Sequence, residues 1–351
     1  MKPMIAVALL FVSLVLISCH RNYGVRRDTP VSTSHESESK STLVFFIHGD
    51  GSYTYHDQKG KRFEADKVIL QQAIAVAESN AHAEVFIFHQ KPKRKWLFLI
   101  KRTDGSFYYF RNGVQLASGS YHRRTQFSEL DSEIEIFKTY RNPGAQERAS
   151  GFLYFGHSLS ELNQETSRQS MNVHGLAQGL SCLVSEVDPN LMRFDLVVLS
   201  ACYSGTPGIV TELAPYSRYI LASAEDLHLA YLDIEPLRRF SEVEFSEIHR
   251  FAKEMASQSF ERLKEWTQTS IVLALYDSEK LAPFLQERQI RQALPSSQPV
   301  PIKYCDCWDT PAAAEDIPSS GVEVYYQPPR FGRLKNKTKH SGWVCWEGTS
   351  K

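Results

Sequence analysis

The chain has 351 residues, enough for one large domain or two small ones, and its 40 Lys and Arg residues balance its 40 Asp and Glu residues. This balance excludes a polycationic nucleic-acid-binding protein. With 42% hydrophobic, 12% aromatic and 23% charged residues, the chain can bury a sizeable core, which excludes a disordered protein.

The first 18 residues have the pattern of an export signal. Lys2 precedes an apolar run from Met4 to Ile17, which is too short for a membrane-spanning helix and has the length of a signal-peptide core. The run ends in Ser18-Cys19 and resembles a bacterial lipoprotein signal, in which the Cys is lipidated and becomes the new N-terminus. An uncleaved anchor is the alternative, and both interpretations place the protein outside the cytoplasm on a membrane. Because residue 20 is His and not Asp, we expect the outer membrane in a host that has two membranes.

Residues 19–41 are polar, so we expect a flexible tether there and a folded part that starts near residue 42. Apolar runs and helical spacing then alternate along the chain. The expected strands are 43–47, 84–88, 96–102, 107–110, 114–117, 152–155, 196–199, 219–222, 271–275, 322–326 and 342–346. The expected helices are 63–78, 128–140, 173–187, 245–266 and 278–290. Asn112-Gly113 between two apolar runs indicates a hairpin.

This alternation predicts one α/β domain over residues 42–292, with a mainly parallel sheet and helices on both faces. In such sheets the active site lies beyond the carboxyl ends of the strands. Two predicted strands run directly into reactive residues, one into Gly156-His157-Ser158 and the other into Ser200-Ala201-Cys202. If these strands are parallel neighbours, His157 and Cys202 emerge side by side. A Cys beside a His can act as a thiolate nucleophile, and the His can protonate the leaving amine. Each residue alone is equally compatible with a buried structural role.

At these positions the chain resembles the clostripain-like cysteine peptidases of the caspase, gingipain and legumain fold group. The resemblance extends over residues 43–290 and includes the opening Val-Phe-Phe-Ile-His-Gly-Asp, the strand that leads to Ala201-Cys202, the segment 216–226 and the late strand 269–275. It implies a caspase-like three-layer fold, an endopeptidase activity with His157 and Cys202 as the catalytic residues, and a peptide or protein substrate. It implies no cofactor.

Two positions differ from the family pattern. Family members usually carry Gly after the catalytic His, where a backbone N–H contributes to the oxyanion hole; this chain has Ser158, which keeps the N–H. Members that cleave after Arg or Lys commonly carry Asp two residues before the Cys, and here that position is Ser200. Since a buried cation needs a charged partner, the substrate pocket would depend on Glu225 or Asp226 for basic specificity. A solvated acidic loop is the alternative for these two residues.

A serine hydrolase is a second interpretation of the same stretch. Residues 156–160 approximate the Gly-x-Ser-x-Gly elbow of α/β-hydrolases, with Ser158 as the nucleophile and His48-Gly49 as an oxyanion motif. The second Gly is replaced by Ser, and the acid and base would have to be Asp226 or Asp277 with His249.

A catalytically silent binding protein is the third interpretation. The segment 91–124 contains nine Lys or Arg residues interleaved with aromatic residues, a composition suited to an anionic glycan, lipid headgroups or a partner protein. The alternative is a solvated hairpin whose aromatic residues pack on the core.

The remaining cysteines indicate at most one structural disulfide. Without Cys19, five cysteines are left, an odd number that suits one free catalytic thiol. Cys305 or Cys307 is available to pair with Cys345 in an oxidising compartment, and Cys182 lies in an apolar helical stretch as a core residue. Cys305-Asp-Cys307 with one distant Cys is a weak zinc pattern, so we expect no metal. Residues 293–351 are rich in Pro and Gly, and we expect an irregular extension there without a function of its own.

Overall fold

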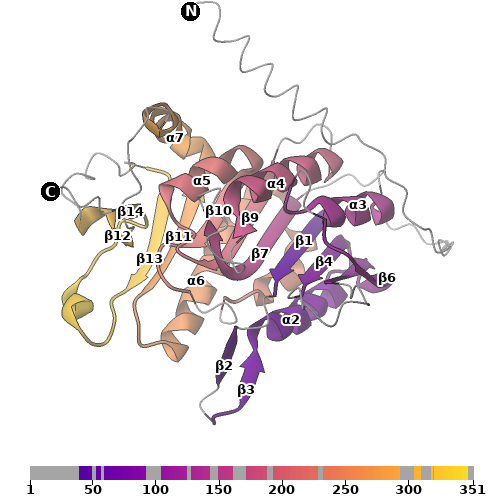
Figure 1. Ribbon diagram of the computed structural model, residues 1–351, viewed down its shortest axis with the longest axis horizontal. Helices are drawn as coiled ribbons and strands as arrows, with labels where there is room; N and C mark the ends of the chain where they lie inside the picture. Colours follow the sequence, from indigo (N-terminus) through magenta and orange to yellow (C-terminus); the bar gives the residue numbers. More distant parts are fainter. Residues whose placement is uncertain are drawn as a thin grey trace, which may run out of the picture.

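A mixed β-sheet of ten strands organises the computed structural model. The structure describes residues 39–49, 53–56, 59–91, 104–124, 128–142, 149–160, 171–187, 193–227, 232–292, 304–309, 318 and 320–346. The strand order is β13-β11-β10-β9-β7-β1-β4-β5-β6, with the short β8 beside β7 (Figure 1). The signal sequence, Cys19, most of the tether and the expected strand 96–102 lie outside the described residues.

Five strands in the middle of the sheet are parallel. They are β10 (Ser217–Ser223), β9 (Phe194–Cys202), β7 (Ala149–Ser160), β1 (Ser41–His48) and β4 (Ala83–Gln90). Apolar side chains alternate between the two faces: Leu43 and Phe45 of β1 belong to one core cluster, and Val44 and Phe46 belong to the other. Burial on both faces explains why these strands are continuous apolar runs in the sequence.

Antiparallel strands complete both sides of the sheet. On one side β4 pairs with β5 (Gly105–Arg111), which forms a hairpin with β6 (Val114–Tyr121). On the other side β10 pairs with β11 (Ile271–Asp277), which pairs with β13 (Val322–Gln327). The mainly parallel sheet is therefore confirmed, and the C-terminal segment contributes its last strand.

Helices cover both faces, as expected (Figure 1). One face packs against α3 (Asp131–Tyr140), α4 (Val173–Val187), α5 (Pro207–Leu213) and α7 (Ser278–Gln292). The other face packs against α2 (Ala65–Ser79), α6 (Ile248–Trp266) and the 3-10 segment η3 (Glu235–Glu242). The elements α5 and η3 were not predicted from the sequence. A local signal for α5 exists, because Pro207 occupies its first turn and the Thr206 hydroxyl accepts a hydrogen bond from the Ile209 N–H at 3.1 Å.

Several short elements complete the described structure. They are β2 (Thr54–His56), β3 (Arg62–Glu64), β8 (Met171–Asn172), β12 (Tyr304–Asp306), β14 (Val344–Trp346) and the 3-10 segments η1 (Ala214–Tyr216), η4 (Phe245–Glu247), η5 (Cys307–Asp309) and η7 (Arg333–Asn336). β2 pairs with β3, and β12 pairs with β14. Among the described helices, none is long and apolar enough to cross a membrane.

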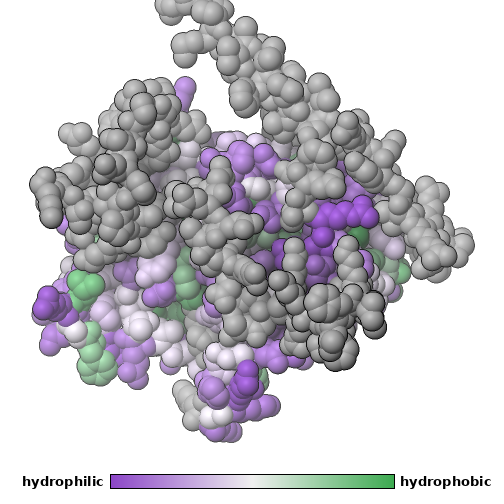
Figure 2. Space-filling view, viewed as in Figure 1, coloured by the Kyte–Doolittle hydropathy of each residue, from purple (hydrophilic) through white to green (hydrophobic). Residues whose placement is uncertain are grey.

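The aromatic residues of the β5–β6 hairpin have a structural role. Phe107, Tyr109 and Phe110 are at most 7% exposed and belong to the core clusters. The Tyr109 hydroxyl donates to the buried carboxylate of Glu84, which is also paired with Arg111. These contacts favour the packed hairpin over a binding surface. The visible face of the described molecule is mostly hydrophilic, with hydrophobic residues in small separate groups (Figure 2).

Candidate active site

The predicted site lies where β7 and β9 end. The two strands are parallel neighbours, with Phe152 opposite Val197, so the arrangement on which the site prediction depends is present. The register becomes irregular after Phe155, and Ser158 then lies opposite Cys202. His157 therefore immediately precedes Ser158, the residue of β7 that lies opposite Cys202 of β9.

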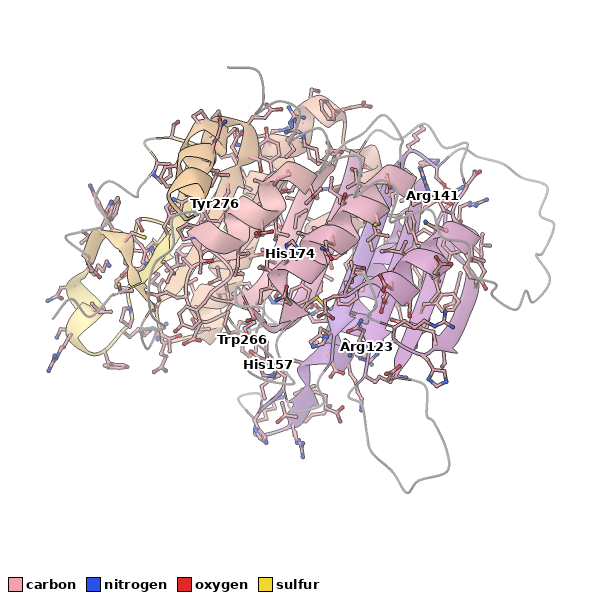
Figure 3. The ribbon with its side chains drawn as sticks, turned by 45° about the horizontal axis from the view of Figure 1, so that its top comes forward. Arg123, Arg141, His157, His174, Trp266 and Tyr276 are labelled. Atoms are coloured by element: carbon pink, nitrogen blue, oxygen red, sulfur yellow. The ribbon has the colours of Figure 1, made fainter. Side chains whose placement is uncertain are left out.

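His157 is partly buried at the carboxyl edge of the sheet. Its ring packs edge-on against Tyr53, with ring centroids 4.7 Å apart. Tyr53 lies between β1 and β2, and its hydroxyl donates to the Leu227 carbonyl at 3.4 Å. Figure 3 shows His157 at this edge, near the β2–β3 hairpin. Tyr53 therefore links the His157 ring to the segment that contacts the Cys202 thiol.

The Cys202 thiol is free and touches the segment that follows β10. Its Sγ accepts a hydrogen bond from the Leu227 N–H at 3.4 Å and donates to the Leu227 carbonyl at 3.5 Å. Burial raises the pKa of Cys202, the negative charge of Asp226 raises it further, and the Leu227 N–H acts in the opposite direction. The thiol is therefore held protonated in this conformation and needs a base or an incoming positive charge to ionise.

Backbone strain occurs directly after this thiol. Among the described non-glycine residues, only Asn112 and Tyr203 have a positive φ, and Tyr203 has a φ of 51°. The Tyr203 N–H donates to the Glu225 carbonyl at 3.1 Å, and its hydroxyl donates to Asp226 at 3.3 Å. Burial, together with the charge of Asp226, raises the pKa of Tyr203 to about 12. The residue after Cys202 is thus fixed in a left-handed conformation by the segment after β10.

The three predicted pocket residues have different surroundings. Ser200 is completely buried inside β9. Glu225 accepts a hydrogen bond from the Ser270 hydroxyl and faces the C-terminal segment. Asp226 is exposed and lies close enough to Cys202 to change its pKa. Asp226 is therefore the one of the three that combines exposure with proximity to the thiol.

Gly205 allows the strand end at Cys202 to approach its neighbours closely. A Cβ atom at this position would lie 2.5 Å from the Tyr276 hydroxyl and 3.0 Å from the Ala224 Cα. Its N–H donates to the Ser223 carbonyl at 2.8 Å. Only glycine fits here without a shift of the backbone.

The serine-hydrolase arrangement is not formed. Residues 149–160 are one strand, so Ser158 is not at a sharp strand-to-helix turn. Asp277 pairs with Tyr219 at the start of β10, and His249 stacks on Tyr219 with ring centroids 5.1 Å apart. Asp277 and His249 therefore lie near the amino end of β10, whereas Ser158 lies near the carboxyl end of the parallel strand β7.

Two hydrogen-bonded groups at the ends of β1 and β4 were not predicted. His48 Nδ1 donates to the Gln90 side-chain oxygen at 2.8 Å, and the Gln90 amide donates to Glu133 at 2.8 Å. Tyr121 donates to the same oxygen of Glu133 at 2.6 Å. Burial raises the pKa of Glu133. The only sequence signal was that His48 and Gln90 each end an apolar run.

The second group joins His89 to Asp66. His89 Nε2 lies 2.9 Å from a carboxylate oxygen of Asp66, in the first turn of α2. Gly49 lies against this pair, and a Cβ atom there would be 2.7 Å from the Asp66 carboxylate.

The cysteines differ from expectation in two ways. Cys305 is outside any disulfide, whereas Cys307 and Cys182 are disulfide-bonded. Cys182 packs against the core as predicted, and it is in addition part of a disulfide, which was not predicted. In the part of the chain that the structure describes, no group of three or more His, Cys, Asp or Glu residues is arranged to hold a metal ion.

A cavity of about 590 Å³ lies beside the C-terminal half of α6. It is lined by Asp233, Glu235, Ser257, Gln258, Glu261, Arg262, Glu265 and Trp266. It contains neither His157 nor Cys202, so it is not the predicted site.

Comparison with known proteins gives a family match for part of the chain. Residues 162–308, which include Cys202, match the sequence model of the clostripain family, Peptidase_C11. No curated protein matches the chain.

Two solved structures illustrate the similarity in fold. The structure of an inactive zymogen C11 protease from Parabacteroides distasonis superposes with a TM-score of 0.57 at 13% identity, covering 89% of this chain and 93% of that one. A secreted C11 cysteine protease from Bacteroides thetaiotaomicron, "iotapain", gives a TM-score of 0.45 at 12% identity, covering 73% of this chain and 72% of that one. The first of these shares the α/β architecture described above. The chain is therefore similar to the clostripain family over residues 162–308 and shares the α/β fold of a C11 protease structure.

Proposed function

We propose that the protein is an endopeptidase in which Cys202 is the nucleophile and His157 is the general acid and base. The observation that carries the proposal is the parallel pairing of β7 and β9, which brings both residues to one edge of the sheet. Cys202 is also outside any disulfide, and the strained backbone at Tyr203 directly follows it.

The proposed reaction has two halves. The Cys202 thiolate attacks the scissile carbonyl carbon, the C–N bond breaks, and the His157 imidazolium gives its proton to the leaving amine. Water then attacks the thioester while His157 takes a proton from it, which releases the acid and restores the thiol. Backbone N–H groups near Ser158 and Cys202 stabilise the oxyanion in both halves.

Cysteine substitution tests this assignment. We expect Cys202→Ala to lose peptidase activity and Cys305→Ala, which removes another cysteine that is outside any disulfide, to keep it. Activity is measured on a mixed peptide library before and after treatment with trypsin, because relatives can require proteolytic activation. Full activity in Cys202→Ala would exclude the mechanism.

We further propose that Asp226 selects a basic residue before the cleaved bond. Its support is that Asp226 is exposed beside the thiol, whereas Glu225 faces Ser270 and His340 and Ser200 is buried. A cationic substrate side chain near Asp226 would also offset the charge that disfavours the Cys202 thiolate. Basic substrates would thereby assist ionisation of the nucleophile.

Profiling against peptides that vary at this position tests the specificity. Asp226→Asn should lower kcat/KM for Arg and Lys substrates by roughly thirtyfold, the effect of removing one partner of a charge pair that is desolvated on binding. Neutral substrates should change little. An Arg or Lys preference that survives in Asp226→Asn would place the pocket elsewhere.

Export and attachment to a membrane through lipid at Cys19 are also proposed, on the pattern of residues 1–19. Labelled fatty acid should enter the wild-type protein and fail to enter Cys19→Ala. Equal labelling of both would leave only a general export signal.

A further inference from the structure

The Glu225 side chain joins the segment after β10 to the C-terminal segment 304–346. One carboxylate oxygen accepts a hydrogen bond from the Ser270 hydroxyl, and the other lies 3.7 Å from His340 Nε2. The Glu225 side chain is 25% exposed and that of His340 is 1% exposed. The carboxylate is therefore turned toward the protein and away from a substrate at Cys202.

The His340 ring is held in one orientation. Its Nδ1 accepts a hydrogen bond from the Gly342 N–H at 2.9 Å, so the neutral ring carries its proton on Nε2, which faces Glu225. Burial lowers the pKa of His340 to about 4, and the ring is therefore neutral at neutral pH. Within the described residues Nε2 makes no hydrogen bond, and its N–H faces two carboxylates, that of Glu225 at 3.7 Å and that of Asp306 at 3.8 Å. The Asp306 carboxylate is fixed by Lys337 at 2.5 Å.

Backbone contacts continue from Glu225 to the nucleophile. The Glu225 carbonyl accepts hydrogen bonds from the Tyr203 N–H at 3.1 Å and the Ser223 hydroxyl at 2.9 Å. Two residues further on, the Leu227 N–H donates to the Cys202 sulfur. Movement of Glu225 would thus be transmitted to both sides of the thiol.

The C-terminal segment also packs on this region through apolar contacts. Val344 forms a buried cluster with Ala224 and Val272, against which Tyr203 and Tyr326 pack. The Val344 N–H donates to the Gly205 carbonyl at 3.4 Å. Figure 1 shows β13 beside β11 at one side of the sheet, with β12 and β14 next to it.

We propose that Glu225 and His340 are a positioning pair, through which the C-terminal segment holds residues 223–227 in place against the Cys202 thiol. Glu225 is then not a substrate-binding acid. The inference rests on the proposed role of Cys202 as nucleophile.

Kinetics of two alanine variants test the pair. Glu225→Ala and His340→Ala should each lower kcat about tenfold, because small displacements of a reacting group cost rate more than binding. KM should stay within about twofold, and the order of preference among peptide substrates should not change. The double variant should lose no more than either single variant, as expected for residues that act as one unit. Glu225→Gln keeps an acceptor for Ser270 and a polar group near His340, and should recover most of kcat.

Glu323→Ala is the matched control. Glu323 of β13 also joins the C-terminal segment to the main domain through a histidine, with 2.9 Å between its carboxylate and His249 Nε2. This pair lies at the amino end of β10, far from Cys202, since His249 stacks on Tyr219. Its loss should leave kcat within about twofold of wild type.

Circular dichroism and size-exclusion chromatography of each variant determine the fraction of folded protein, so that kcat refers to folded protein. An unchanged kcat in Glu225→Ala, or an altered substrate preference, would overturn the positioning role. Equal losses in Glu225→Ala and Glu323→Ala would overturn it too, because they would show a general effect of loosening the segment. Failure of the underlying mechanism is visible separately as activity that persists in Cys202→Ala.

Discussion

Histidines occupy two places along the same edge of the sheet, and their surroundings differ. At the ends of β1 and β4, His48 and His89 make short side-chain hydrogen bonds to Gln90 and Asp66. At the ends of β7 and β9, Cys202 contacts the backbone of Leu227 at 3.4 to 3.5 Å, beside a strained residue. The first arrangement joins one nitrogen of each ring to a buried side chain, and the second leaves a weakly held thiol at the strand edge that also carries His157, whose ring packs on Tyr53. The two strand ends carry similar residues but differ in function. Hydrogen bonds at the ends of β1 and β4 stabilise the fold, whereas the weaker contacts at the end of β9 leave Cys202 able to react.

The largest difference should appear in His157→Asn. Loss of the general acid and base should reduce kcat/KM by about a thousandfold or more, while the midpoint of thermal unfolding changes by only a few degrees. His89→Asn should show the reverse, with lower thermal stability and activity close to wild type. Peptide hydrolysis and thermal unfolding are measured on both variants. If the two substitutions changed activity and stability alike, the proposed difference between the two places would be wrong.

Glu133→Ala should have the next largest effect. Removal of this carboxylate leaves the Gln90 amide and the Tyr121 hydroxyl without their acceptor, at a cost of about 2 to 3 kcal/mol in the free energy of unfolding. Urea unfolding measures this loss. Glu135→Ala, on the same helix but less buried, is the control and should change stability by less than about 0.5 kcal/mol. Equal stability of the two variants would show that the hydrogen-bonded group contributes nothing.

A smaller effect concerns acid stability. Burial opposes ionisation of Asp66, but the hydrogen bond and charge of His89 outweigh it and hold the pKa of Asp66 below its usual value. A lowered carboxyl pKa stabilises the folded state above the unfolded pKa, and this contribution is lost as pH falls through the folded pKa. Asp66→Asn should therefore be less stable than wild type at neutral pH, with the difference shrinking below about pH 4. A difference that grows on acidification would contradict the assigned direction.

The smallest expected effect is on the thiol itself. Because the charge of Asp226 helps to raise the pKa of Cys202, Asp226→Asn should move the pH midpoint of Cys202 alkylation to lower values. Mass spectrometry of the Cys202 peptide measures this without interference from Cys305. Asp233→Asn neutralises an acid that lines the cavity and does not contribute to the pKa shift of Cys202, so it should leave the midpoint at its wild-type value.

Local sequence signals predicted most elements near the nucleophile. The helix 173–187 was predicted with its observed bounds, and β7 and β9 were predicted from apolar runs that are buried on both faces. The site prediction assumed that β7 and β9 are parallel neighbours, and the structure confirms this pairing.

Contacts between distant segments could not be predicted in the same way. The run 322–326 was predicted as a strand, but nothing local indicates that it pairs with β11. Likewise, Glu225 and Asp226 are neighbours in sequence with similar chemistry. What distinguishes them is the position of Ser270 and His340, which depends on tertiary packing.

The position of β13 also has a consequence for the timing of activity. This strand is contributed by one of the last parts of the chain to be synthesised, whereas His157 and Cys202 are made much earlier. A growing or prematurely terminated chain that ends before residue 304 therefore contains both proposed catalytic residues but lacks Val344 against Ala224 and His340 beside Glu225. The proposed catalytic centre is thus completed by a segment that is synthesised after both proposed catalytic residues.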